Sequence, residues 1–188
     1  MMIEDINIYL FHCINATTTP NPIAYHLAVF LSHNVIGLFI GFLIILLFFK
    51  GKDYKSLFVK TLLMVGIALL MKELIELFYY HPRPFELHLG QKLIGHGSTS
   101  SFPSSHTLTM STIAFAFLLG GYRKIGVLGL ILGLCVGWSR VYLGVHFPLD
   151  IIGSFVIAFA TVMGTNLFLK EFALRVRKYF QPPLSDTP

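Results

Sequence analysis

Five long apolar runs, separated by shorter polar stretches, dominate the pattern of the chain. They cover residues 23–49, 57–80, 103–122, 125–143 and 148–169. Each run is close to or above the roughly 20 apolar residues that a helix needs to cross the hydrocarbon core of a bilayer. The pattern therefore predicts an all-α integral membrane protein, a helical bundle of about five transmembrane helices.

The first twenty residues are too short for a span and have a different pattern. Ile3, Ile6 and Leu10 recur at helical spacing, opposite a polar, solvated side formed by Glu4, Asp5 and Asn7. An amphipathic helix of this kind lies in the membrane interface. Its start is acidic and lacks Lys and Arg, which argues against a cleaved signal peptide. We expect an N-terminal interfacial helix ahead of the spans, and a single membrane-embedded domain over residues 1–188.

Composition agrees with a membrane protein. Of the 188 residues, 55% are hydrophobic and 12% are charged, about half the charged fraction of a typical soluble domain. The net charge of +5 could suggest a nucleic-acid partner, but the basic residues lie in short clusters between apolar runs. That distribution is typical of membrane topology, so no nucleic-acid binding is expected. Two cysteines, Cys13 and Cys135, form no disulfide framework.

Lysine and arginine are distributed unevenly between the two ends of the predicted spans. Ten of the fourteen fall on one side, after the first and third runs and in the C-terminal stretch. The other four are Lys72, Arg83, Lys92 and Arg140. The positive-inside rule makes the ten cytoplasmic and places the N-terminus outside. The connections 81–106 and 144–148 then share the outer face.

The stretch Trp138 to Asp150, WSRVYLGVHFPLD, carries three chemically useful side chains on that face. Pro148 suits the first turn of a helix, so His146 lies just outside a helix N-terminus, where free N–H groups attract an anion. Arg140 offers a fork of donors that matches phosphate oxygens. The Asp150 carboxylate, one turn into the helix, can fix the tautomer of an imidazole and support its charge. This combination indicates phosphoryl transfer.

Two further motifs lie in the 81–106 connection. In HPRPF, residues 81–85, each proline biases its predecessor away from helix, so Arg83 projects from a stiff extended backbone. In SFPSSH, residues 101–106, the proline marks a helix start that exposes N–H groups and hydroxyls. That start carries Ser104, Ser105 and His106. Taken alone, it is explained equally well by ordinary N-capping.

The three motifs HPRPF, FPSSH and SR-x5-H-x3-D occur in this order and together resemble the signature of the type-2 phosphatidic acid phosphatase superfamily, shared with vanadium haloperoxidases. FHCINAT and WSRVYLGVHFPLD are similar to the bacitracin-resistance type of undecaprenyl pyrophosphate phosphatase. The resemblance implies that His146 is a nucleophile forming a phosphohistidine, that Asp150 orients it, and that His106 protonates the leaving group. The phosphate oxygens would be held by Arg83, Arg140, Ser104 and Ser105.

The chain departs from the superfamily pattern at two positions. Glu76 stands where the first motif usually has Lys, and Lys72 lies one helical turn deeper on the same face. Lys72 could contact the substrate or only neutralise Glu76, and both readings remain open. Ser105 stands where the broader pattern has Gly. His96, which precedes Gly-Ser-Thr in the outer loop, is a further candidate for binding a second phosphate.

We therefore expect a phosphatase that converts polyprenyl (undecaprenyl) diphosphate to the monophosphate at the outer face of a bacterial inner membrane, recycling the lipid carrier of cell-wall synthesis. Its expected partners are this lipid substrate and the surrounding membrane lipids, with no cofactor. One alternative is a lipid phosphatase or phosphotransferase acting on phosphatidic acid, phosphatidylglycerophosphate or another head group. Another is a transporter that uses the same charges as an anion site. The acidic residues are too few and scattered for a two-metal hydrolase, so no metal is expected.

Overall fold

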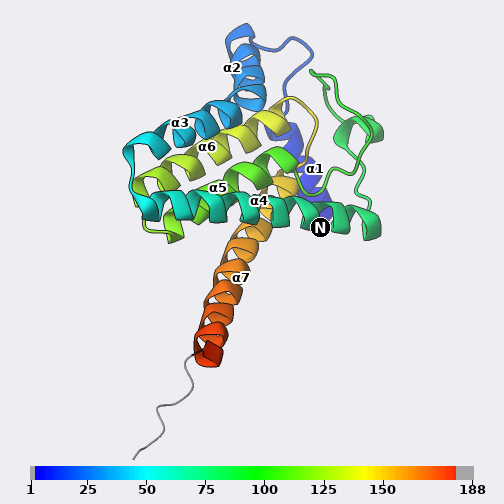
Figure 1. Cartoon of the computed structure of the whole chain (residues 1–188). Helices are drawn as coiled ribbons and strands as arrows, with labels where there is room; N and C mark the ends of the chain where they lie inside the picture. The colour runs from blue at the N-terminus through cyan, green and yellow to red at the C-terminus, as the bar shows by residue number, and fades with distance from the viewer. Residues whose placement is uncertain (1–2, 181–188) are drawn as a thin grey trace, which may run out of the picture.

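The computed structural model describes residues 3–180, which form α-helices and one 3₁₀ helix, η1, without a strand (Figure 1). The helices are α1 (Ile3–Ile14), α2 (Pro22–His33), α3 (Val35–Phe49), α4 (Lys52–Phe78), η1 (Pro84–Leu87), α5 (Ser105–Leu119), α6 (Arg123–Tyr142) and α7 (Pro148–Phe180). The prediction of an all-α protein is confirmed. The single domain stays a prediction, and residues 1–2 and 181–188 of that range lie outside the described part.

Helix α5 lies at the centre of the bundle. It packs against α4, α6 and α7 (Figure 1), and most of its side chains are buried. An apolar cluster joins Met110 and Phe117 of α5 to Phe39 of α3 and Tyr54 of α4. The start of α5, where the FPSSH motif ends, is thereby fixed relative to the other helices.

Glycines allow α6 to lie very close to its neighbours. A Cβ added at Gly126 would lie 2.5 Å from the backbone of Leu118 in α5, and one at Gly129 would lie 2.9 Å from the Cβ of Ala114. A Cβ at Gly137 would meet Ile151 of α7 at 2.5 Å. The glycines along α6 thus form a packing surface. It brings the end of α6, with Arg140, against α5 and α7.

Among the described residues, two helices, α6 and α7, are long and apolar enough to cross a membrane. The α2–α3 pair passes the same test jointly but is bent by 48°. The apolar run 23–49, predicted as one span, therefore forms two helices that meet at Asn34, and its crossing of the membrane stays a prediction. Helix α4 carries several charges and α5 has 15 residues, so the count of five spans stays a prediction.

Helix α1 packs against the start of α7 through its polar side as well as its apolar side. Phe11 is fully buried and lies edge-on to Phe147. Asn7, expected on the solvated side, is buried, because its Oδ1 accepts the otherwise free N–H of Leu149 at 3.0 Å. Asn15 bonds Gln91 and the C-terminal end of α6. Helix α1 therefore ties together the segments that carry the motifs.

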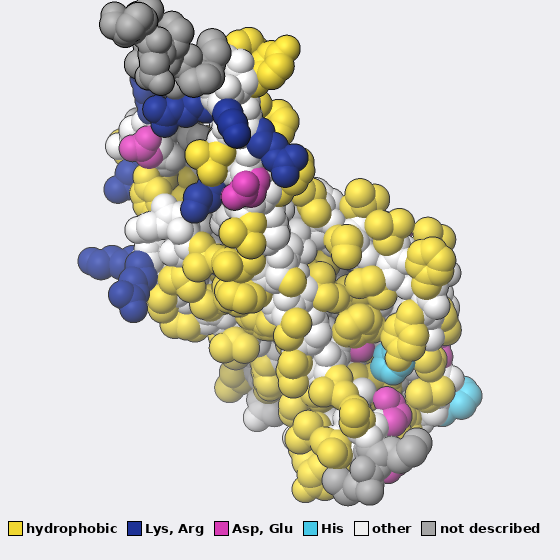
Figure 2. Space-filling model, turned by 90° about the horizontal axis from the view of Figure 1, so that it is seen from below, with side chains coloured by type: hydrophobic (Ala, Val, Ile, Leu, Met, Phe, Trp, Pro, Cys, Tyr) yellow, Lys and Arg dark blue, Asp and Glu magenta, His cyan; other side chains and the backbone are white. Residues whose placement is uncertain are grey.

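Helix α7 continues well past the predicted end of the fifth span. Its 33 residues correspond to about 50 Å at 1.5 Å per residue, and it projects beyond the bundle (Figure 1). The basic stretch 170–178, expected as a tail, is its last part. Figure 2 shows Lys and Arg side chains gathered at this end of the molecule, with some acidic side chains among them, and His side chains with further acidic ones at the opposite end. Between them the surface is largely apolar.

Candidate active site

Arg83 lies where the loop after α4 meets the connection between α6 and α7. Its backbone is extended and leads into η1. The Arg83 N–H donates to Glu86 Oε2 at 2.7 Å, and the Tyr80 hydroxyl donates to the same carboxylate at 2.9 Å. Glu86 thereby fixes the backbone from which the Arg83 side chain projects.

The Arg83 guanidinium is buried and uses its donors on two segments of the protein. Nε donates to Thr99 O at 2.8 Å, and Nη2 donates to Thr99 Oγ1 and Ser100 O. Nη1 donates to Val145 O at 2.7 Å and lies 3.2 Å from Nε2 of His146. Arg83 therefore joins the 81–106 connection to the 144–148 connection and touches the imidazole predicted to be the nucleophile.

The partners of the His146 ring determine its tautomer. Nδ1 lies 2.7 Å from Ser101 O, and a carbonyl oxygen can only accept, so Nδ1 carries the proton. Nε2 faces Arg83 Nη1, which can only donate, so Nε2 holds a lone pair. The ring is thus a neutral imidazole whose Nε2 is free to act as a base or nucleophile.

His146 is almost fully buried, at 1% exposure, in the connection between α6 and α7. The chain turns there through Gly144, whose φ of 77° suits glycine. Burial lowers the pKa of His146 to about 4, against the opposing effect of the nearby Asp150 carboxylate. The unprotonated form that the hydrogen bonds indicate is therefore also the form that burial favours at neutral pH.

Asp150, also buried, lies on the Nδ1 side of His146. Its Oδ2 accepts the N–H of Phe147 at 2.8 Å and the hydroxyl of Ser101 at 2.5 Å, and lies 3.6 Å from His146 Nδ1. The nearest acceptor to Nδ1 is the Ser101 carbonyl at 2.7 Å, so the Asp150 carboxylate, predicted to orient His146, lies beyond direct hydrogen-bond distance of the ring. The reason is that the same oxygen also caps the start of α7. Asp150 supports the ring both across this gap and through Ser101.

Arg140, at 2% exposure, has donors that the protein does not use. Its Nη1 donates to Ser32 Oγ at 2.6 Å, whereas Nε and Nη2 are buried and have no partner among the described residues. A buried guanidinium with unused donors is costly unless an anion completes it. Arg140 is therefore the group best placed to receive phosphate oxygens.

The start of α5 lies on the same side of the site. Ser104 is buried, and its N–H donates to Ser154 Oγ of α7 at 2.9 Å. Ser105 and His106 begin the helix and are half-buried. The charges that act on His106 come from Arg140, His146, His96 and His33. His106 therefore lies within electrostatic range of Arg140 and His146, and its role in the site stays a prediction.

The two remaining candidates differ in their surroundings. The His96 ring lies edge-on to His146, with ring centroids 6.2 Å apart, and burial lowers its pKa. Lys72 does not join the group of side chains around His146. Its Nζ lies 2.8 Å from Glu76 and 3.1 Å from Glu73. This geometry favours neutralisation of Glu76, while the substrate contact of Lys72 stays a prediction.

Three residues with no role predicted from the sequence contact the site. Ser101 bonds both His146 and Asp150, Ser32 bonds Arg140, and His81 Nδ1 lies 3.3 Å from Asp150 Oδ1. Ser101 and His81 fall inside the motifs, but nothing in their spacing distinguishes them from spacer residues. Ser32 lies in an apolar run far from any motif. Only tertiary structure identifies these contacts.

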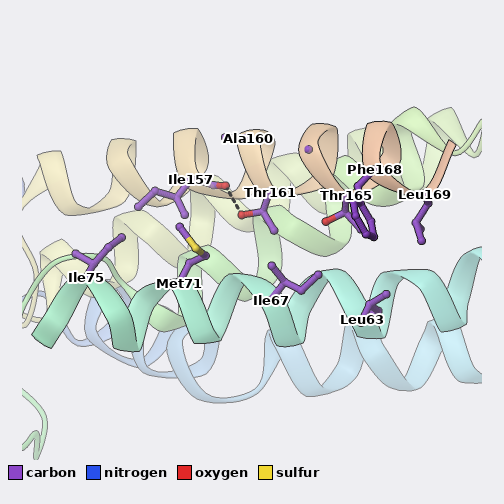
Figure 3. Close-up of a pocket in the computed structure, with 11 residues that line it drawn as sticks. Leu63, Ile67, Met71, Ile75, Ile157, Ala160, Thr161, Thr165, Phe168 and Leu169 are labelled. Carbon is purple, nitrogen blue, oxygen red and sulfur yellow. Dashed lines mark hydrogen bonds between the residues drawn. The ribbon is translucent and has the colours of Figure 1, made fainter. Parts of the chain in front are cut away.

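An apolar groove of about 580 Å³ runs between α4 and α7. Figure 3 shows its lining side chains pointing toward one another from the two helices, with Met71 and Ile75 on α4 opposite Ile157 on α7. Ile75 lies one turn before the end of α4, and Ile157 lies about two turns after Asp150. One end of the groove is thus near the elements that carry the site, and its other end lies deeper along both helices.

A helical bundle with large apolar surfaces and a buried His, Asp and Arg group at one end defines a membrane phosphoryl-transfer enzyme. The chain belongs to the PAP2 superfamily, whose model matches residues 57–173. It is 35% identical over 154 residues to the undecaprenyl-diphosphatase BcrC of Bacillus subtilis, covering 81% of this chain and 79% of that protein. It is 33% identical over 153 residues to YbjG of Escherichia coli, covering 81% and 77%. The family resemblance of the motifs is confirmed.

Solved structures agree in fold. LpxE of Aquifex aeolicus superposes with a TM-score of 0.66 at 28% identity, covering 88% of this chain and 98% of that one. A transmembrane PAP2-type phosphatidylglycerolphosphate phosphatase of Bacillus subtilis superposes with a TM-score of 0.68 at 21% identity, covering 90% and 87%. The protein is therefore a membrane-embedded member of a phosphatase superfamily.

Proposed function

We propose that the protein removes the terminal phosphate of a polyprenyl diphosphate, with His146 as the nucleophile. The observation that supports this most directly is the hydrogen bonding of the His146 ring. A neutral imidazole with a proton on Nδ1 and a lone pair on Nε2 is the form that attacks phosphorus. The name of the Bacillus subtilis relative, an undecaprenyl-diphosphatase, supports the choice of substrate.

In the first step Nε2 attacks the terminal phosphorus. The N–P bond forms while the bridging P–O bond breaks, and the lipid monophosphate leaves. Arg140 Nε and Nη2 donate to the transferring oxygens, together with N–H groups at the start of α5 and the side chains of Ser104 and Ser105. Arg83 Nη1 shifts from Nε2 to a phosphoryl oxygen once Nε2 carries the phosphorus.

In the second step water releases inorganic phosphate from the phosphohistidine. His106, whose electrostatic neighbours are Arg140 and His146, protonates a poor leaving group in the first step and activates water in the second. Asp150 and the Ser101 carbonyl support the Nδ1–H of His146, which gains positive character while the phosphoryl group is attached.

The polyprenyl chain lies in the groove between α4 and α7 (Figure 3). The lining is almost entirely aliphatic and aromatic, with two threonines, so it suits a hydrocarbon chain and offers little to a polar one. The active site faces the outside of a bacterial inner membrane in a five-span arrangement. The concentration of basic side chains at the other end of the molecule supports this orientation (Figure 2).

The first experiment is phosphate release by the purified protein from a panel of lipids. Undecaprenyl diphosphate, phosphatidic acid and phosphatidylglycerophosphate are compared at equal surface concentration. We expect the diphosphate to be the preferred substrate, with full activity in chelator because Arg83 and Arg140 supply the positive charge. A preference for a monophosphate lipid reassigns the substrate, and binding without phosphate release favours a transporter.

The second experiment separates the two histidines by leaving group. His146→Ala should release no phosphate and form no acid-labile phosphoenzyme. The leaving group from a diphosphate is a phosphate monoester, with a pKa near 6 by analogy with phosphorylated side chains, so it needs little proton assistance. His106→Ala should therefore keep a single-turnover burst with the diphosphate, but lose on the order of 10²–10⁴-fold in the first step on a lipid monophosphate. Equal losses in that step on both substrates would show that His106 only binds phosphate.

A further inference from the structure

The two carboxylate oxygens of Asp150 have different surroundings. Oδ2 faces the catalytic side, where it meets Ser101, the Phe147 N–H and His146. Oδ1 points the other way, toward His81, whose Nδ1 lies 3.3 Å from it. The orientation of the carboxylate plane therefore depends on His81 as well as on the groups around Oδ2.

His81 is held firmly in this position. Its N–H donates to Ser100 Oγ at 3.1 Å, and its carbonyl accepts the Ser101 N–H at 2.7 Å. The ring stacks on Tyr79, with centroids 6.0 Å apart and planes 10° from parallel, and its other neighbour is Phe147 at 5.5 Å. A histidine packed on both sides has little freedom to turn away from Asp150.

The far side of the His81 ring faces helix α1. Nε2 lies 3.9 Å from Oε1 of Glu4, which is 46% exposed. A cavity of about 210 Å³ beside Asp150 is lined by Glu4, His81 and Asn7, among others. Since Asn7 also bonds the Leu149 N–H, α1 is fixed to the start of α7. A series of neighbouring charged and titratable side chains thus leads from the surface to the nucleophile: Glu4, His81, Asp150 and His146.

We propose that His81 is a positioning residue that holds Asp150 toward His146, and that Glu4 of α1 sets the charge of His81. This inference rests on the proposed function, because its purpose is to keep a carboxylate aimed at Nδ1 while Nε2 carries the phosphoryl group. In this role neutral His81 turns its Nδ1–H onto Asp150 Oδ1, 3.3 Å away, without cancelling the charge of Asp150. Protonated His81 neutralises Asp150 and weakens its support of the phosphorylated ring.

The charged groups facing the ring are Asp150 of α7 and Glu4 of α1, and both raise the pKa of His81, Asp150 more than Glu4. Activity should therefore fall as the pH falls through the pKa of His81. Removing Glu4 lowers that pKa, so the acid limb of the pH profile moves to lower pH.

The test compares two substitutions that separate the ring of His81 from its hydrogen-bond donor. His81→Phe keeps the stacked ring but removes the donor, whereas His81→Asn replaces the ring by an amide that can donate to Asp150. We expect kcat to fall on the order of 10-fold or more in the Phe variant, the value of one hydrogen bond to a charged group, with KM unchanged. The Asn variant should keep most of the wild-type kcat, and its pH profile should lack the acid limb. His12→Phe, at an exposed position of α1, is the control. Equal falls in kcat in the two variants, or a change in KM, would overturn the positioning role.

The second measurement needs no substrate and therefore separates this inference from the proposed function. The His81 resonance, identified by its absence from the His81→Asn spectrum, should titrate above pH 6.5 in the wild-type protein and at lower pH in Glu4→Gln. Glu171→Gln, the same charge change near the far end of α7, should leave it in place. An unshifted His81 resonance in Glu4→Gln would remove Glu4 from the series. If His81 responds as expected but no lipid is hydrolysed, the proposed function fails and the coupling between His81 and Glu4 stands.

Discussion

At the scale of single residues, the two arginines of the site have the same charge but opposite circumstances. The donors of Arg83 form hydrogen bonds with protein acceptors, whereas two nitrogens of Arg140 have no partner among the described residues. We expect Arg140→Gln to weaken competitive inhibition by inorganic phosphate about 10–100-fold, because hydrogen bonds to charged groups contribute about 1.5–3 kcal/mol each. Its melting temperature should change little.

Arg83→Gln should instead lower the melting temperature, because it removes the bonds that join the outer connections. Arg123→Gln, an exposed arginine at the start of α6, is the control for charge alone. Inhibition and thermal unfolding in detergent are measured on all three variants. If Arg83→Gln melts like the wild-type protein while Arg140→Gln retains phosphate inhibition, the roles drawn from the hydrogen bonds are wrong.

The buried state of His146 makes a second prediction at this scale. Because burial lowers its pKa to about 4, the ring should stay unprotonated between pH 8 and pH 5. A histidine with an ordinary pKa near 6.5 would be mostly protonated at pH 5. NMR of protein labelled at histidine Cε1 measures this, with His146→Gln identifying the resonance. A midpoint near 6.5 would contradict the environment described here.

The same lowered pKa has a consequence for stability. Between pH 6.5 and about 4 the unfolded chain binds a proton at this position and the folded protein does not. The free energy of unfolding therefore falls as the pH falls through this range. His146→Gln should lose that part of the acid sensitivity. The measurement is the free energy of unfolding of this variant and of the wild-type protein at both ends of the pH range.

At the scale of elements, the contact between α5 and α6 depends on the absence of side chains. Gly126→Ala places a Cβ 2.5 Å from the backbone of Leu118, and overpacking of this kind costs about 1–3 kcal/mol. Gly66→Ala is a matched control, since nothing lies within 4 Å of its added Cβ and alanine is the better helix former. Thermal unfolding should show a loss for Gly126→Ala and no loss for Gly66→Ala. Equal melting temperatures of the two variants would mean that α5 and α6 can move apart without loss of stability.

The elements also show what the sequence could and could not predict. Apolar periodicity located the helices because most of their faces meet either lipid or core. It did not locate the break at Asn34, because the apolar run continues through it and the contact made nearby, Ser32 with Arg140, joins segments far apart in the chain. It also placed Asn7 in solvent, since a polar residue on an amphipathic helix is assigned to water unless a distant donor is known.

At the site, the three motifs predicted which segments converge, because all three were assigned to one face by the distribution of basic residues. The structure brings Arg83, His146 and Asp150 into contact. Sequence could not predict how they are connected, because Ser101 and His81 look like spacers until the loop that carries them is folded over α7. The ion pairs of Lys72 were within reach of sequence reasoning, since spacing alone placed Glu76 beside it.

At the scale of the whole molecule, orientation in the membrane can be tested directly. In a variant with Cys13 and Cys135 replaced by serine, Gly97→Cys should react with an impermeant thiol reagent in intact cells, because Gly97 is exposed in the 81–106 connection, which we propose faces outward. Lys124→Cys, on the opposite side, should react only after the membrane is opened. The reverse pattern would place the active site in the cytoplasm.

The groove between α4 and α7 has a consequence for kinetics. Because the groove lies between two helices with many exposed apolar side chains, the proposed lipid substrate would reach it by diffusing sideways within the leaflet and not from solution. The concentration that sets the rate is then the number of substrate molecules per unit of membrane area. Diluting vesicles with buffer should leave the initial rate per vesicle unchanged, whereas diluting the substrate with inert lipid at constant total volume should lower it. KM is then a mole fraction of substrate in the membrane. Inorganic phosphate leaves into water, so its concentration is the usual one per volume of solution.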